Sequence, residues 1–282
     1  MGRITKALEI AEKISGTKSF DTAPSFPEEM PAVARGPLPA APTDQTLVTL
    51  NDVDSPAAEE YRRLKSKIMA QLKKDESSNV LLVASALAGE GKSITAANLA
   101  ISMAQGYNNT VILIDADLRK PTLAALLNVK HPKGLSDYLD GNAAVEEIIA
   151  RTGVPKLTFV PGGRASANPV ESLSSNRMRN LIGEMKYRYP DRYIIIDTAP
   201  SLPFAEAHAL SAMVDRTLLV VRERVSSLQN VADAIASLNG SPLVGIVYND
   251  SDAVDMNRVY GYYGRYGKYG AVRREINDKA GE

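Results

Sequence analysis

A glycine-rich segment that ends in lysine and serine is the part of this sequence best suited to chemistry. Residues 86–93 read ALAGEGKS, the spacing of a phosphate-binding P-loop with alanine at its first position. Glycines let backbone N–H groups close around phosphate, and the helix expected over residues 94–105 adds its dipole. The segment predicts an ATP site in which Lys92 reaches the β and γ phosphates and Ser93 binds Mg²⁺. The alternative is a structural glycine turn. The predicted nucleotide contacts are Gly89, Glu90, Gly91, Lys92, Ser93 and Ile94.

Three aspartates follow two other apolar segments of the chain. Asp115 and Asp117 end the segment VILIDAD, and Asp197 directly follows YIII. Residues two apart on a strand share a face, so Asp115 and Asp117 could both turn toward the phosphates. An acid after a buried strand is typical of Walker B, whose carboxylate holds Mg²⁺ directly or through water. We therefore expect all three carboxylates at one site. The alternative for the first two is helix capping before Pro121.

Six continuous apolar runs determine the expected architecture, each separated from the next by a stretch able to form a helix. Continuous runs indicate strands buried on both faces, and their spacing leaves room for crossover helices. The chain is therefore predicted to be an α/β protein with a doubly wound, mainly parallel sheet and helices on both faces, the fold of P-loop NTPases. Ligands bind beyond the carboxyl ends of such strands. The runs cover residues 80–85, 111–117, 157–163, 193–200, 217–223 and 243–250.

The two ends of the chain differ in composition from this centre. Residues 3–15 have helical apolar spacing and predict a short amphipathic helix, and the proline-rich residues 17–45 predict an extended linker. Residues 258–282 hold five tyrosines separated by glycines and cationic residues, which predicts a flexible tail. We expect an N-terminal extension over residues 1–45, a P-loop domain over 46–257 and a tyrosine-rich tail over 258–282.

The composition excludes several classes of function. The 282 residues include no cysteine, which rules out disulfides, cysteine nucleophiles and iron–sulfur sites. Lys plus Arg and Asp plus Glu both number 33, so the overall charge gives no reason to expect nucleic acid as a partner. No apolar run approaches the roughly 18 to 20 residues that cross a bilayer. We therefore expect a cytoplasmic protein that is neither secreted nor membrane-spanning.

Four segments, GEGKS, ILIDADLRKP, IIIDTAP and the terminal YGYYGRYGKYG, together resemble the bacterial tyrosine kinase (BY-kinase) family, from about residue 55 to the C-terminus. Family members are cytoplasmic P-loop autokinases tied to exopolysaccharide synthesis and export. The resemblance implies ATP and Mg²⁺ as cofactors and Asp115 as the acceptor of the tyrosine proton. It places Asp117 and Asp197 beside Ser93 at the metal. The start of the chain also resembles the soluble, exosortase-associated branch of the family.

The tail supplies the expected phosphate acceptors. Tyrosines in a glycine-rich segment can reach an active site because no packing energy holds them elsewhere. The reach of the tail predicts transfer in trans between subunits. The alternative use of this segment is adhesion or nucleic-acid binding, since tyrosines between cations can stack on bases. The resemblance implies autophosphorylation at Tyr260, Tyr262, Tyr263, Tyr266 and Tyr269.

One predicted helix carries residues suited to a subunit interface. Glu59, Arg62 and Lys65 resemble the Glu-x-x-Arg-x-x-Arg helix through which family members pack into rings. Lysine stands at the last arginine position and lacks the bidentate fork, which predicts a weaker ring-like homo-oligomer. The alternative is a solvated helix face. The resemblance further implies two partners, a transmembrane polysaccharide co-polymerase that recruits the chain to the inner face of the membrane and a phosphotyrosine phosphatase.

The competing functional class is a non-kinase switch ATPase, such as the partition and septum-positioning ATPases. These carry a signature lysine four residues before Gly91, where this chain has Leu87. That difference and the tyrosine tail favour a kinase over a switch ATPase or an idle scaffold. Asn249 lies where related ATPases contact adenine, or it makes an ordinary turn. Arg119 could steady phosphate or a neighbouring chain, or form a surface ion pair.

Overall fold

The computed structural model describes residues 38–74, 78–107, 109–188 and 192–251. The helix expected over residues 3–15 and most of the proline-rich linker lie outside this part of the chain. So does the tail, with Tyr260, Tyr262, Tyr263, Tyr266 and Tyr269. No helix in the described ranges is both long and apolar enough to span a bilayer.

A seven-stranded sheet forms the centre of the described residues, in the order β3-β4-β2-β5-β1-β6-β7. Neighbouring strands are parallel, except that the short β3 (Ala150–Arg151), which the sequence did not predict, pairs antiparallel with β4. The doubly wound, mainly parallel sheet is therefore confirmed. The six apolar runs form β1 (Val80–Ser85), β2 (Thr110–Asp115), β4 (Leu157–Val160), β5 (Arg192–Asp197), β6 (Arg216–Arg222) and β7 (Leu243–Asn249).

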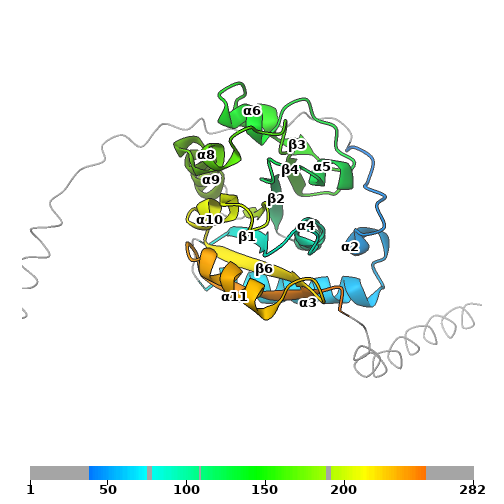
Figure 1. Cartoon of the computed structure of the whole chain (residues 1–282). Coiled ribbons are helices and arrows are strands. Elements are labelled where there is room, and N and C mark those ends of the chain that lie inside the picture. The colour runs from blue at the N-terminus through cyan, green and yellow to red at the C-terminus, as the bar shows by residue number, and fades with distance from the viewer. Residues whose placement is uncertain (1–37, 75–77, 108, 189–191, 252–282) are drawn as a thin grey trace, which may run out of the picture. The chain divides into compact units, whose positions relative to one another are not determined.

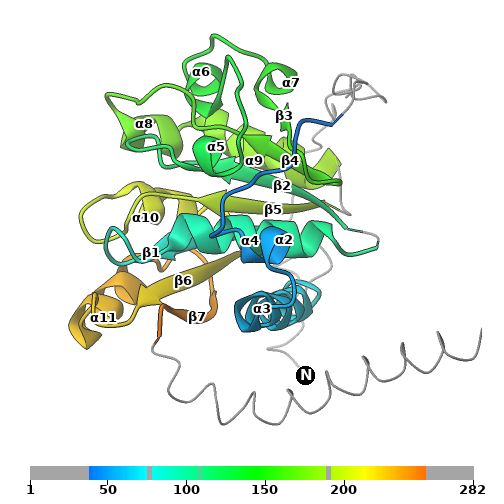
Figure 2. The same ribbon diagram turned by 90° about the vertical axis from the view of Figure 1, so that its right-hand side faces the viewer.

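Helices cover both faces of the sheet, as Figures 1 and 2 show. One face carries α2 (Val48–Asn51), α3 (Pro56–Leu72) and α4 (Lys92–Ala104). The other carries α8 (Pro169–Ser174), α9 (Asn176–Arg188) and α10 (Glu206–Ser211). The described part also contains α5 (Leu123–Leu126), α6 (Leu135–Leu139), α7 (Val145–Ile148) and α11 (Leu228–Ser237).

The helix α4 is the central packing element of its face. It is buried from Thr95 to its end, and Leu99 joins Leu81 of β1 and Leu113 of β2 in one apolar core. Burial of each such side chain stabilises the fold by roughly 1.5 to 3 kcal/mol. The core therefore fixes the helix that begins at the P-loop.

A buried amide attaches the segment before α3 to the same helix. Oδ1 of Asn98 in α4 accepts the N–H group of Thr49 at 3.0 Å, and its Nδ2 donates to the backbone oxygen of Thr46 at 2.8 Å. Gln105, just after α4, donates to the backbone oxygen of Thr49 at 2.9 Å. Residues 46–49 are thus held along α4 by side chains that were not predicted to matter.

The carboxyl ends of the parallel strands bring the predicted site residues to one edge of the sheet. Asp115 ends β2 and pairs in register with Asp197 at the end of β5. On its other side Asp197 pairs with Val83 of β1, two residues before the end of that strand. The loop that follows β1 therefore lies beside both acids.

Candidate active site

The P-loop connects β1 to α4, which is the order of strand, loop and helix that phosphate binding requires. Gly89 and Gly91 have φ angles of 80° and 89°, in the left-handed region that residues with a Cβ atom rarely adopt. A Cβ atom at Gly91 would also lie 2.2 Å from Nδ2 of Asn249. The φ angle therefore favours glycine at both positions, and at Gly91 the contact with Asn249 disfavours a Cβ atom as well. The first turn of α4 contains the predicted residues Lys92, Ser93 and Ile94.

Lys92 lies among the predicted acids. Its Nζ atom is 3.2 Å from Oδ2 of Asp117 and 3.6 Å from Oδ1 of Asp197. It also donates a hydrogen bond to Oγ of Ser93 at 3.1 Å. Burial alone would lower the pKa of Lys92, but the charges of Asp197 and Asp117 outweigh it and raise the pKa above its ordinary value. The lysine is therefore a fixed positive charge at the end of the P-loop.

Asp115 and Asp197 are completely buried carboxyl groups on adjacent strands. Burial, and then the nearby charge of Asp197, raise the pKa of Asp115 to about 7. Oδ2 of Asp115 accepts the N–H groups of Thr122 and Leu123 at 3.1 and 3.0 Å. Burial also raises the pKa of Asp197, and the charge of Lys92, whose Nζ atom lies 3.6 Å from Oδ1, opposes this effect. Neither oxygen of Asp197 has a hydrogen bond of ordinary length among the described residues. Asp115 thus holds the loop after β2, whereas Asp197 keeps free acceptor capacity.

The raised pKa of Asp115 makes the stability of the metal-free protein depend on pH. Between about pH 4 and pH 7 the folded protein retains a proton that the unfolded chain, with its ordinary pKa of 3.8, has released. The free energy of unfolding therefore falls as the pH rises through this range. Through Asp115 the wild type should lose roughly 3 kcal/mol of its free energy of unfolding between pH 5 and pH 8. We expect this loss to be absent in Asp115→Asn.

Urea unfolding in the presence of a chelator, at both pH values and without nucleotide, measures this difference. Asparagine keeps a side-chain oxygen for the N–H groups of Thr122 and Leu123, so the contacts with the loop can remain. Asp54→Asn, at an exposed position, is the matched control. The same pH dependence in the wild type and in Asp115→Asn would contradict the raised pKa.

Two predicted nucleotide contacts, Glu90 and Asn249, make hydrogen bonds within the protein. The Glu90 carboxylate is completely buried and accepts the N–H group of Leu87 at 2.7 Å. Nδ2 of Asn249 donates to the backbone oxygen of Glu90 at 2.9 Å. Contact between Asn249 and adenine stays a prediction. What the structure adds is that this side chain supports the P-loop.

Arg222, at the end of β6, is a P-loop contact that the sequence analysis did not single out. Its Nη1 atom donates to the backbone oxygen of Gly89 at 3.3 Å, and its Nε atom donates to Oδ2 of Asp250 at 2.8 Å. The sequence feature that could have indicated Arg222 is its position at the carboxyl end of a predicted strand, because ligands bind at that edge of the sheet.

Comparisons with known proteins agree with this geometry. The AAA domain family matches residues 78–240, more than half of the chain. The chain is 32% identical over 221 residues to tyrosine-protein kinase YwqD of Bacillus subtilis. The aligned region covers 77% of this chain and 91% of YwqD. The chain belongs to the bacterial tyrosine kinase family.

Two further comparisons give the extent of this similarity in structure and in sequence. The kinase domain of the Escherichia coli tyrosine kinase ETK matches with a TM-score of 0.65 at 28% identity, over 73% of this chain and 82% of that one. EpsB of Ralstonia solanacearum is 32% identical over 264 residues, which are 93% of this chain but 34% of EpsB. The chain therefore spans about a third of the length of that relative.

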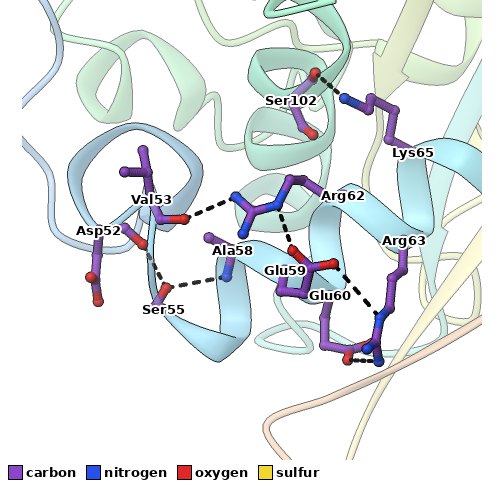
Figure 3. A network of polar contacts seen from close by, with 10 residues as sticks. All are labelled: Asp52, Val53, Ser55, Ala58, Glu59, Glu60, Arg62, Arg63, Lys65 and Ser102. Atoms are coloured by element: carbon purple, nitrogen blue, oxygen red, sulfur yellow. Dashed lines mark hydrogen bonds and ion pairs between the residues drawn. The ribbon is translucent and has the colours of Figure 1, made fainter. Parts of the chain in front are cut away.

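The predicted interface helix of this chain is α3, shown in Figure 3. Nε of Arg62 donates to Oε2 of Glu59 at 2.7 Å, and its Nη1 atom donates to the backbone oxygen of Val53 at 2.9 Å. Nζ of Lys65 donates instead to the backbone oxygen of Ser102 at 3.2 Å. Ser102 lies in the last turn of α4, where the helix dipole stabilises a nearby cation. Lys65 thus contacts its own chain, and a ring contact through α3 stays a prediction.

Arg119 links the loop after β2 to α10. Its Nε atom lies 2.6 Å from Oε1 of Glu206, and its guanidinium lies 4.2 Å from the centre of the Phe204 ring. Glu206 is 1% exposed, so the ion pair joins a surface arginine to a buried acid. The pair fixes the loop that carries Asp117. An ion pair was the alternative expected for Arg119, but its partner could not be named from the sequence, because the two residues lie 87 residues apart.

Proposed function

We propose that this chain is an ATP-dependent protein tyrosine autokinase that phosphorylates the C-terminal tyrosine cluster of a second copy. The observation that carries the proposal is the position of Lys92, whose Nζ atom lies beside both Asp117 and Asp197 directly after the P-loop. Phosphoryl transfer needs such a cluster, since charge on the transferred group must be balanced and the metal must be held. Membership of the bacterial tyrosine kinase family supports tyrosine as the acceptor.

The residues of the site fit ATP and Mg²⁺. Left-handed glycines give the loop the kind of conformation that cradles phosphate, and Asp197 has two buried oxygens without a hydrogen bond among the described residues. No group of three or more acids or histidines in the described ranges is arranged to hold a metal by itself. Mg²⁺ at phosphate sites needs no such group, because one or two carboxylates act together with the phosphates. The proposed metal ligands are Ser93, Asp117 and Asp197.

Each residue has a proposed role in the transfer. The tyrosine oxygen forms a bond to the γ phosphorus, the bond to the β–γ bridging oxygen breaks, and ADP leaves. Lys92 holds the β and γ phosphate oxygens, and Asn249 lies against the base. Bound Mg²⁺ supplies neutralisation of the phosphate charge. The P-loop backbone from Gly89 to Ile94 surrounds the phosphates.

The tyrosine proton goes to a carboxylate after β2, and the family resemblance assigns this role to Asp115. Asp115 is completely buried and its Oδ2 atom already accepts the N–H groups of Thr122 and Leu123, so a tyrosine hydroxyl contacts it only after a local rearrangement. Asp117 has a side chain that is 10% exposed and already lies beside Lys92. Asp117 is also a proposed metal ligand, so the phosphorylation rates of Asp115→Asn and Asp117→Asn are compared at low and at high Mg²⁺. A loss that high Mg²⁺ restores belongs to the metal, and a loss that it does not restore belongs to proton transfer.

The biological setting of the proposal follows from the family resemblance. The process is regulation of exopolysaccharide synthesis and export. Copies of the chain assemble into a ring-like homo-oligomer through Glu59, Arg62 and Lys65. A transmembrane polysaccharide co-polymerase recruits the chain to the inner face of the membrane and activates it, and a phosphotyrosine phosphatase resets the tail.

Intact mass spectrometry tests the proposed function. Purified protein is compared before and after incubation with ATP and Mg²⁺, and again after treatment with a tyrosine phosphatase. We expect a gain of up to five phosphates, one for each tail tyrosine, that the phosphatase removes. A variant with all five tail tyrosines changed to phenylalanine is the control. Hydrolysis of ATP without a change in mass would contradict the kinase proposal and favour a switch ATPase.

A further inference from the structure

Glu90 is an acid inside a phosphate-binding loop, and the structure explains how the loop accommodates it. The residue lies between the left-handed Gly89 and Gly91, and its side chain is completely buried. A carboxylate facing the phosphates would repel them, because like charges at a few ångströms disfavour one another. In the structure this carboxylate contacts protein on the side of β6 instead.

Three neutral donors hold the Glu90 carboxylate. Oε2 accepts the N–H group of Leu87 at 2.7 Å, within the P-loop itself. Oε1 accepts the hydroxyl of Ser226 at 2.7 Å and the N–H group of Arg222 at 3.2 Å. An ionised carboxylate can accept all of these bonds at once, and hydrogen bonds to charged groups are the stronger ones. The side chain therefore joins the P-loop to the end of β6 and the loop that follows it.

The backbone around Glu90 is held from the same side. Its carbonyl oxygen accepts Nδ2 of Asn249 from β7, and the carbonyl oxygen of Gly89 accepts Nη1 of Arg222 from β6. These contacts fix two carbonyl groups of the loop against the sheet edge. Two glycines have wide conformational freedom, so a loop built on them needs such contacts to keep one shape.

We propose that Glu90 is a positioning residue that holds the P-loop, through Ser226, in the conformation that binds nucleotide phosphates. The inference rests on the proposed nucleotide site but does not require the kinase reaction. It predicts that nucleotide affinity depends on a carboxylate that does not touch the nucleotide and on a serine in the loop after β6. It also predicts that the two side chains act as one unit.

The test is the dissociation constant of ADP with Mg²⁺, measured by calorimetry on the full chain, together with the thermal unfolding midpoint. We expect Glu90→Ala to weaken binding about tenfold, because the buried N–H group of Leu87 loses its acceptor. Glu90→Gln keeps an acceptor for Leu87 and can donate to the Ser226 oxygen, so it should weaken binding by about threefold. Glu146→Gln, at an exposed position on α7, is the matched control and should bind as the wild type does.

A double-mutant cycle tests whether Ser226 is the partner. Ser226→Ala should weaken binding by about threefold, and adding it to Glu90→Ala should cause no further loss. Unchanged affinity in Glu90→Ala, or a lower unfolding midpoint with unchanged affinity, would overturn the proposal, and so would strictly additive effects. If Glu90→Ala does not fold, Glu90→Gln and Ser226→Ala decide the matter by the same criteria. A wild-type chain that binds no ADP would count against the proposed nucleotide site itself.

Discussion

Replacing Lys92 by methionine is expected to lower the rate of autophosphorylation about 10²-fold to 10³-fold, the usual cost of removing one preorganised charge or donor from a transition state. The Nζ atom of Lys92 lies next to Asp117 and Asp197, where the γ phosphate is proposed to bind. Methionine has similar length but no charge. The phosphates would then face two carboxylates without the cation that balances them.

The fold should survive this change, because the core that packs α4 starts at Thr95 and does not include the Lys92 side chain. Circular dichroism and thermal unfolding establish that the variant is folded, and a time course of intact mass with ATP and Mg²⁺ gives the rate. Lys120→Met applies the same substitution to an exposed lysine on the neighbouring loop. A folded Lys92→Met chain that gains phosphate at the wild-type rate would contradict the assignment of the P-loop.

Most strands of the sheet were predictable because they are buried on both faces. The expectation was wrong for β7, an edge strand on which Leu243, Ile246 and Tyr248 are exposed. The predicted runs begin at residues 80, 111, 157, 193, 217 and 243, within one residue of the observed starts. Their ends were placed up to three residues too late, since the predicted runs included the first residues of the site loops, such as residues 161–163 after β4. The strand β3 has two residues and exists through its pairing with β4, which no local pattern encodes.

The acids and lysine of the site were predictable from topology, whereas their supports were not. Parallel strands share a carboxyl edge, so Asp117 and Asp197 had to lie near the lysine that follows β1. Sequence spacing does not show which way a side chain turns once it reaches that edge. Glu90 turns toward Ser226, 136 residues away, and Lys65 turns toward Ser102 on its own chain. Such contacts depend on packing between elements.

The second large effect is expected when two complementary variants are mixed. A Lys92→Met chain can accept phosphate but transfers it only at its residual rate, and an active chain whose five tail tyrosines are phenylalanine can transfer it but not accept it on the tail. If the transfer occurs in trans, the Lys92→Met chain should gain phosphate much faster in the mixture than alone. The difference in rate should approach the 10²-fold to 10³-fold expected for the loss of Lys92, because the active chain supplies the missing lysine.

The length of chain beyond β7 permits this transfer. Tyr260 is the tenth residue after Asp250, and an extended chain of that length spans about 33 Å at roughly 3.3 Å per residue. Residues 258–282 carry six Lys or Arg and three acids, so the segment starts net positive and is attracted to a site lined with aspartates. Each phosphate adds roughly −1.5 to −2 charges, so two phosphates at least neutralise the tail and three or more reverse its sign.

The reversal of the charge of the tail should therefore stop further phosphorylation. A heavily phosphorylated tail should leave a site lined by Asp115, Asp117 and Asp197, and the ring should loosen, which sedimentation of the mixed chains before and after ATP measures. Labelling of the Lys92→Met chain should rise with the concentration of the active chain, because the two must meet. If the Lys92→Met chain gains no phosphate in the mixture under conditions in which the wild type labels itself, transfer is intramolecular. Phosphorylation of the tail would then not depend on a ring.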